Sequence, residues 1–248
     1  MNPTNFIHQL RYQDLPEQVM AQARRCVLDL LGVAAGGTQT QLSRIIRQHA
    51  VRHLASREQE ARILFDGRRA SMAGAALAGG MTMDSLDAHD GHVLTKGHAG
   101  VAVLPTVLAF ADALRHMDGQ EFLTQIVIGY EIATRAGIAL HATACDYHTS
   151  GAWNTIACAA LGARNLQLDQ QQTLEAMGIA EYHGPRSQMM RCIGKPLARA
   201  VRTKSWPSTS SMLERVMRAT KPICTQASVK VGNAMWRAQS HGLLVNAT

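Results

Sequence analysis

Aromatic side chains are scarce in this sequence, at 4% of its residues, whereas alanine, glycine, methionine and leucine are plentiful. Small apolar side chains let helices pack closely, and it is aromatic and β-branched side chains that favour strands. No pair of alternating runs is joined by a tight turn, so the sequence shows no hairpin signal. A βαβ rhythm, a Gly-x-Gly-x-x-Gly fingerprint and a P-loop are also missing, which argues against the common nucleotide-binding folds. We therefore expect an all-α protein.

Long apolar runs are also missing. No stretch holds eighteen consecutive apolar residues, so we expect no transmembrane helix and no membrane partner. The N-terminus, MNPTNFIHQLRYQDLPEQ, lacks a basic region followed by an apolar run, so no signal peptide is expected. The five cysteines are odd in number, widely spaced and never arranged as Cys-x-x-Cys, which favours reduced thiols. These absences together predict a cytoplasmic protein.

Charge is distributed unevenly along the chain. Residues 191–248 contain ten Lys or Arg and one acid, a net charge of +9, whereas residues 1–190 contain 15 basic and 17 acidic residues, a net charge of −2. Sustained periodicity also ends near Gly194, and three prolines interrupt the remaining residues. We expect a helical domain over residues 1–194 and a divergent basic tail over residues 195–248, poorly ordered or irregular.

The basic tail raises the possibility of nucleic-acid binding. No recognisable binding motif accompanies the charge, and few aromatic residues are interleaved with it, so a nucleic-acid partner is not expected. A steep salt dependence of DNA binding would favour that alternative.

Helical periodicity recurs along the whole domain. Asp14 can cap a first helix that has Pro16 in its first turn and ends at Gly36–Gly37. Residues 61–66 suggest a short extended piece before a turn at Gly67. Further helices are predicted as an amphipathic run over 42–51 and a buried Ala-rich helix over 70–83. Pro105 is expected to start the next helix, which runs over 106–117 and stops at Asp118–Gly119. The remaining predicted helices are a long one over 120–140, an Ala-rich one over 153–163, one capped by Asp169 that runs to about 180, and a weak one over 210–219.

One segment concentrates the ionisable groups of the chain. Residues 84–105 read DSLDAHDGHVLTKGHAGVAVLP and place three carboxylates and three histidines within fifteen residues. The members of this group are Asp84, Asp87, Asp90, His89, His92 and His98. A carboxylate beside an imidazole fixes its tautomer and raises its basicity, as a general base requires. We expect these side chains on the loop that leaves the Ala-rich helix.

Two alternative roles for this segment stay open. Histidine and aspartate at short spacing also bind Zn or Fe, but His-x-x-His-x5-His matches no familiar metal motif, so we expect no metal. A polar loop solvated at the surface is the simpler alternative.

Two further constellations carry weaker signals. His148 lies in a turn, Tyr-His-Thr-Ser-Gly, between two apolar helices, where a histidine is often only a cap or a surface residue. Arg186 and Arg191 could bind a substrate carboxylate bidentately, although spacing alone favours solvated arginines.

Several motifs in order resemble the MmgE/PrpD family, whose members include 2-methylcitrate dehydratase, cis-aconitate decarboxylase and iminodisuccinate epimerase. The similar stretches, over about residues 6–193, are DLPEQVMAQARRCVLDLLGVAAGG, ILFDGRRASMAGAALAGG, LDAHDGH with KGHAGVAVLP, IGYEIATRAG and DYHTSGAWNTIACAALGARNLQLDQQQTLEAMGIA. Three positions depart from the family pattern: Gly80 replaces an asparagine, His89 an acid and Ala99 a proline.

This resemblance implies acid–base chemistry on a small di- or tricarboxylate. His98 and His148 would supply the acid and the base, Asp87 would orient one of them, and no organic cofactor is implied. A homodimer is also expected. The residues expected to bind the substrate are Asp90, His92, Lys96, Arg186, Arg191 and Lys195.

The resemblance fades near residue 194, whereas family members are roughly twice as long and carry an α+β lid domain. The expected fold is therefore the helical domain with the lid missing. Three functions remain open: a lyase that dehydrates or decarboxylates its substrate, an epimerase of the same family, or an inactive truncated remnant, for example after a frameshift near Gly194. Translation of the encoding DNA in the other frames after codon 194 would identify a frameshift.

We expect weak or absent dehydratase activity from the 248-residue chain. Without a lid the site stays open to water, which weakens electrostatic stabilisation of a carbanion-like transition state. Turnover of 2-methylcitrate by the purified protein measures this. Efficient turnover with no partner chain would contradict the expectation.

Overall fold

The computed structural model describes residues 2–56, 58–144 and 148–184, and almost all of its regular structure is helical. Its elements are α1 (Pro3–Gln9), the 3-10 turn η1 (Tyr12–Asp14), α2 (Glu17–Gly37), α3 (Gln41–His53), β1 (Glu60–Arg62), β2 (Arg69–Ser71), α4 (Met72–Asp84), α5 (Gly100–Leu114), α6 (Gly119–Thr143), α7 (Gly151–Asn165) and α8 (Gln170–His183). The all-α prediction is confirmed. No helix among the described residues is long and apolar enough to cross a membrane. The predicted tail, 195–248, lies outside the described residues, and the boundary at 194 stays a prediction.

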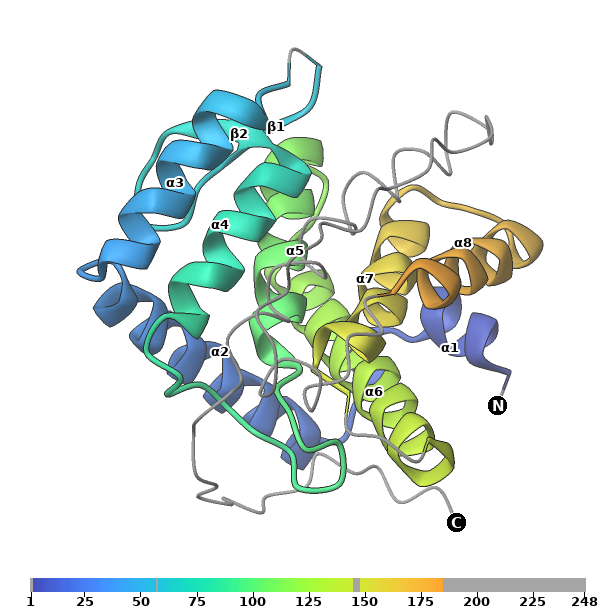
Figure 1. Ribbon diagram of the computed structural model, residues 1–248. Coiled ribbons are helices and arrows are strands. Elements are labelled where there is room, and N and C mark those ends of the chain that lie inside the picture. The colour runs from blue at the N-terminus through green and yellow to red at the C-terminus, as the bar shows by residue number, and fades with distance from the viewer. Residues whose placement is uncertain (1, 57, 145–147, 185–248) are drawn as a thin grey trace.

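Helices α4 and α5 lie side by side at the centre of the molecule (Figure 1). In α4, every residue except Met81 is buried, so the helix has no solvent-facing side. Helix α3 packs on α4, and α7 packs on α5 and is itself covered by α6 and α8. The predicted buried Ala-rich helix is thus confirmed as the middle of the core.

Helix α5 begins earlier than the sequence suggested. We expected Pro105 to start the helix, but α5 begins at Gly100 and contains Pro105. Proline has no N–H to donate to the carbonyl of Val101, one turn earlier. A Cβ on Gly80 of α4 would lie 2.9 Å from that carbonyl oxygen, and one on Gly79 would lie 3.0 Å from Pro105 Cβ. The two glycines therefore leave room for the proline-containing turn.

One predicted helix stop and one predicted cap belong to other elements. Asp118 begins α6, because its side chain accepts a hydrogen bond from the Glu121 N–H at 2.8 Å, while α5 already ends before Arg115, whose φ is 54°. Asp14 caps the short turn η1 by accepting the Arg11 N–H at 2.9 Å, and Pro16 directly precedes α2. Asp169 does cap α8 as predicted.

The described residues contain one short hairpin, for which the sequence shows no signal. Strands β1 and β2 pair antiparallel, with Ala61 opposite Ala70, and Gly67 in the turn has a φ of 80°. Each strand is three residues long, which is too short for an alternating pattern to be recognised in the sequence. The extended piece predicted near residues 61–66 is confirmed by β1 at its start.

The N-terminal segment is held by one arginine on α7. Arg164 donates to the carbonyl of Leu10 at 2.9 Å and forms an ion pair with Glu121 of α6 at 2.7 Å. This bridge keeps α1, which the sequence analysis missed, against α7 and α8.

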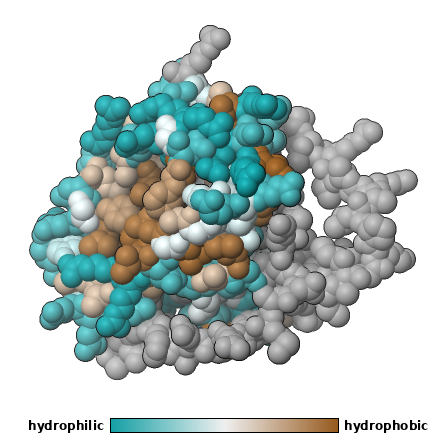
Figure 2. Space-filling view, turned by 90° about the vertical axis from the view of Figure 1, so that its left-hand side faces the viewer, coloured by the Kyte–Doolittle hydropathy of each residue, from teal (hydrophilic) through white to brown (hydrophobic). Residues whose placement is uncertain are grey.

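Apolar residues reach the surface on the side where α2 and α3 lie. Brown residues gather near the centre of that face in Figure 2. Leu28 of α2 is 73% exposed and Ile45 of α3 is 55% exposed.

The contact between α2 and α4 makes a testable prediction about two glycines of one helix. A Cβ on Gly37 would lie 2.1 Å from the backbone oxygen of Thr82, which cannot rotate away, whereas a Cβ on exposed Gly32 would meet nothing within 4 Å. Gly37→Ala should lower the free energy of unfolding by about 1–3 kcal/mol. Gly32→Ala should raise it by up to about 1 kcal/mol through helix propensity. Urea unfolding measures both, and equal effects would contradict the packing.

Candidate acid–base site on the loop between α4 and α5

The loop over residues 85–99 joins the end of α4 to the start of α5 (Figure 1, lower centre). Because both helices are buried, the two ends of the loop are fixed. A backbone bridge closes its tip, where the His92 N–H donates to the Gly97 carbonyl at 2.9 Å. Asp87 and Lys96 both adopt left-handed backbone conformations, with φ of 49° and 48°. The loop therefore has a defined shape.

Three hydrogen bonds hold His98. Its ring Nδ1 lies 2.7 Å from the backbone carbonyl of Asp90, its N–H donates to Ser150 Oγ at 2.9 Å, and its carbonyl accepts from Asn154 Nδ2 at 2.8 Å. A carbonyl oxygen can only accept, so Nδ1 carries the proton. In the neutral ring, Nε2 then holds the lone pair that can accept a proton.

Asp87 faces this second nitrogen. Its Oδ1 lies 3.9 Å from His98 Nε2, which is too long for a hydrogen bond but close enough to stabilise a positive charge on the ring. The hydrogen bond that orients the ring comes instead from the Asp90 carbonyl.

His89 lies beneath this pair. Its side chain is completely buried, and its ring centroid lies 4.2 Å from that of His98, with the planes tilted by 43°. Burial lowers the pKa of His89 from 6.5 to about 3, and the neighbouring His98 acts in the same direction. His89 is therefore neutral near pH 7. Within the described part of the chain, neither of its ring nitrogens has a hydrogen-bond partner.

The carboxyl group of Asp90 faces the protein interior. A Cβ on Gly100 would lie 2.4 Å from Asp90 Oδ1 and 2.2 Å from the Tyr130 hydroxyl, so both groups crowd the first residue of α5. Burial raises the pKa of Asp90 and also that of Tyr130. Nearby Cys26 has its pKa raised to about 11, by burial first and by the Asp90 charge second. Asp90, Tyr130 and Cys26 therefore form the buried surroundings on the interior side of the loop.

Some of the remaining predicted site residues lie at or beside the loop, and the others lie outside the described residues. His148 is half-buried and lies two residues before Ser150, whose hydroxyl contacts His98. His92 is half-buried, and its Nδ1 accepts the Thr95 N–H at 3.4 Å. Lys96 is exposed on the same loop. Arg186, Arg191 and Lys195 lie outside the described residues.

Three ligand atoms converge at this place. One from each of Asp87, His89 and His98 lies within 4.8 Å of the other two. The sequence analysis set the metal alternative aside because the histidine spacing matches no familiar motif, and these three residues meet only because the loop folds back on itself.

Sequence reasoning gave no role to two polar residues at the start of α7. Ser150 and Asn154 hold the backbone of His98 from a segment more than fifty residues away. Their stretch resembles the family pattern, but no local signal in the sequence connects them with His98.

Comparisons with known proteins agree on one family. Residues 3–196 match the MmgE/PrpD N-terminal domain. The chain is 25% identical over 189 residues to cis-aconitate decarboxylase-like protein oryM of Aspergillus oryzae, covering 71% of this chain and 38% of that protein. It is 28% identical over 204 residues to human cis-aconitate decarboxylase, covering 78% of this chain and 39% of the relative. The mouse protein of the same name is 27% identical over 203 residues, with 79% and 39% covered. The chain thus spans less than half the length of these relatives.

The buried, neutral His89 should make stability depend on pH. The unfolded chain takes up a proton on His89 as the pH falls through 6.5, but the folded protein does not do so until about pH 3. The free energy of unfolding should therefore fall between these values, by on the order of 2 kcal/mol from pH 7 to pH 5. In the His89→Phe variant, the unfolded chain cannot take up a proton at position 89, so the free energy of unfolding should fall less over the same pH interval. Urea unfolding at both pH values measures the difference, and parallel losses would contradict the burial.

Proposed function

The chain belongs to the MmgE/PrpD family, and on that premise we propose that it supplies acid–base residues for lyase chemistry on a small di- or tricarboxylate. The curated relatives are named as cis-aconitate decarboxylases, which makes an unsaturated tricarboxylate the first substrate to test. Dehydration of a 2-hydroxy-tricarboxylate such as 2-methylcitrate is the second, and epimerisation within the same family is the alternative.

The observation that carries this proposal is the orientation of His98. Its Nδ1–H is committed to the Asp90 carbonyl, and its Nε2 faces the carboxylate of Asp87. A histidine held in one tautomer, with its free nitrogen beside a carboxylate, suits a group that takes up and returns a proton. The partly exposed His98 side chain also leaves Nε2 within reach of a substrate.

The proposed chemistry uses both protonation states of Nε2. In dehydration, neutral His98 takes the proton from the carbon next to a carboxylate, and the electron pair left on that carbon expels the β-hydroxyl group. In decarboxylation, the bond to the departing carboxylate breaks, CO2 leaves, and the electron pair of that bond stays on the carbon. Protonated His98 then gives its proton to this carbanion-like carbon. Asp87 stabilises the imidazolium in both cases.

His148 is proposed as the second proton-transfer group. The contact between Ser150 and the His98 backbone holds the segment that carries His148 next to the loop. In dehydration, His148 would protonate the leaving hydroxyl.

Binding of the substrate carboxylates is proposed for Lys96 and His92 on the loop, together with Arg186, Arg191 and Lys195. For Asp90 the geometry supports a positioning role, because its carbonyl holds His98 while its carboxyl group lies against Tyr130. A homodimer also stays a proposal, for which the exposed apolar face of α2 and α3 is a candidate contact surface.

The experiment compares steady-state turnover of cis-aconitate and 2-methylcitrate by the full chain and its variants. His98→Ala and His148→Ala should each lower kcat by roughly 10²–10⁴-fold with little change in KM, because each is proposed to move a proton in the transition state. Asp87→Asn should lower kcat less, because it removes only a charge at 3.9 Å from the ring.

His53→Ala is the matched control, because His53 is an exposed histidine at the end of α3, and its activity should equal that of the unaltered chain. Equal rates for the His98 and His148 variants would refute the roles proposed for those residues. Absence of turnover with both substrates would refute the enzymatic function proposed for this chain and favour the alternative of an inactive truncated remnant.

A further inference from the structure

We propose that Asp87, His89 and His98 form a binding site for a divalent first-row transition-metal ion such as Zn²⁺. One ligand atom from each lies within 4.8 Å of the others. Ligands around a tetrahedral Zn²⁺, at bond lengths of about 2.0–2.2 Å, lie roughly 3.4 Å apart. Small side-chain rotations would therefore close the site, and a fourth position would stay open toward solvent beside the exposed Asp87.

Buried His89 is the independent sign of a ligand. Its residue exposure is 6%, its side chain is fully buried, and no described residue forms a hydrogen bond with either ring nitrogen. A buried polar group without a hydrogen-bond partner is costly, so a native structure needs a reason to retain one. A metal ion bound to the ring would supply that reason.

The groups around the two histidines have the arrangement that supports metal ligands. His98 donates Nδ1–H to a backbone carbonyl, which leaves Nε2 as the ligand atom. Nε2 of His89 lies 3.7 Å from Asp84 Oδ1, which is too long for a hydrogen bond but close enough for the carboxylate to favour the proton on Nε2 and leave Nδ1 for a metal. The charges of Asp84 and Asp87 would balance the two positive charges of the ion.

The donor set selects the class of ion. Two imidazoles and one carboxylate suit Zn²⁺ and its first-row neighbours, whereas Mg²⁺ prefers a full set of oxygen ligands. His89 determines this preference, because an acidic residue at position 89 would leave His98 as the one nitrogen ligand among the three residues.

Metal binding and proton transfer would compete. His98 Nε2 has one lone pair, which can hold either the ion or a proton, so an occupied site should be inactive in the proposed reaction. This consequence rests on the proposed function, but binding of the ion does not.

The test is a titration of the full chain with Zn²⁺, followed by calorimetry and with Mg²⁺ as the comparison ion. One equivalent of Zn²⁺ should bind at this site, and Mg²⁺ should not. His89→Phe keeps a ring in the buried space, and Asp87→Asn suits the left-handed backbone at that position. Each variant should weaken Zn²⁺ binding by more than roughly 100-fold. Mutation of a residue that only supports a ligand already lowers metal affinity by about 10–100-fold, and these variants remove a ligand itself.

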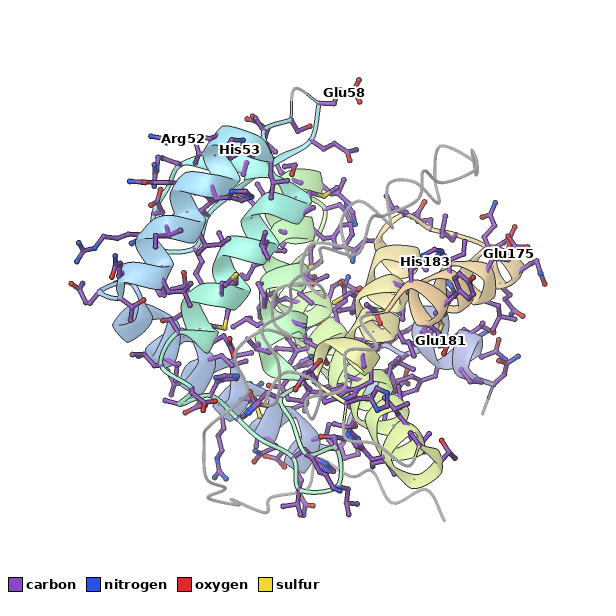
Figure 3. The ribbon with its side chains drawn as sticks, viewed as in Figure 1. Arg52, His53, Glu58, Glu175, Glu181 and His183 are labelled. Atoms are coloured by element: carbon purple, nitrogen blue, oxygen red, sulfur yellow. The ribbon has the colours of Figure 1, made fainter. Side chains whose placement is uncertain are left out.

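A second histidine pair needs its own control. His49 and His53 lie one turn apart on α3, with ring centroids at 4.8 Å, and could bind Zn²⁺ at the surface. Figure 3 labels His53 at the upper end of α3, at the opposite end of the molecule from the loop 85–99. The double variant His49→Ala/His53→Ala should leave the tight site unchanged.

The possible results distinguish a metal site at the loop from binding elsewhere and from the proposed catalytic function. Loss of Zn²⁺ binding in the α3 double variant, or unchanged binding in both His89→Phe and Asp87→Asn, would overturn the proposal. Tetrahedral Co²⁺ absorption in the unaltered chain and its loss in Asp87→Asn, with an unchanged circular dichroism spectrum, would support it even if His89→Phe failed to fold. Turnover that requires His98 in a chain that binds no Zn²⁺ would refute the metal site and leave the proposed function intact.

Discussion

Close packing of α4 against α5 is the constraint on which the rest of this structure depends. Alanine and glycine residues let the two helices approach until Gly79 and Gly80 face Pro105 and the carbonyl of Val101. Larger side chains would separate the helices and move the points where the loop 85–99 leaves and returns. Because those points are fixed in the core, the loop can hold its ionisable side chains at defined distances from one another.

The loop meets two opposed requirements at once. A proton-transfer group needs contact with solvent or substrate, yet its orientation is best secured by buried partners. His98 satisfies both, because its backbone and Nδ1 are held by Asp90, Ser150 and Asn154 while Nε2 faces the exposed Asp87. His89 stays neutral below it, so only one of the two stacked rings carries a charge when a proton arrives.

Position 89 connects the two proposals made for this site. An acid there, as the family resemblance would imply, would add a negative charge beside His98 and Asp87. A neutral imidazole adds a nitrogen donor instead, and this changes which ions the site can hold. The lone pair of His98 Nε2 is common to both proposals, so any ion that binds it would block the proton transfer proposed for it.

The helical class and most helix positions were determined by the sequence itself, because apolar spacing and caps such as Asp169 act within a few residues. The concentration of carboxylates and histidines in residues 84–98 was visible for the same reason. Only the tertiary structure decided that Pro105 lies inside α5, since the room for it comes from glycines on another helix. It also decided that His89 is buried and that Ser150 and Asn154 hold His98. These contacts join residues whose separation along the chain carries no local signal, and they form because burial in the core brings distant segments together.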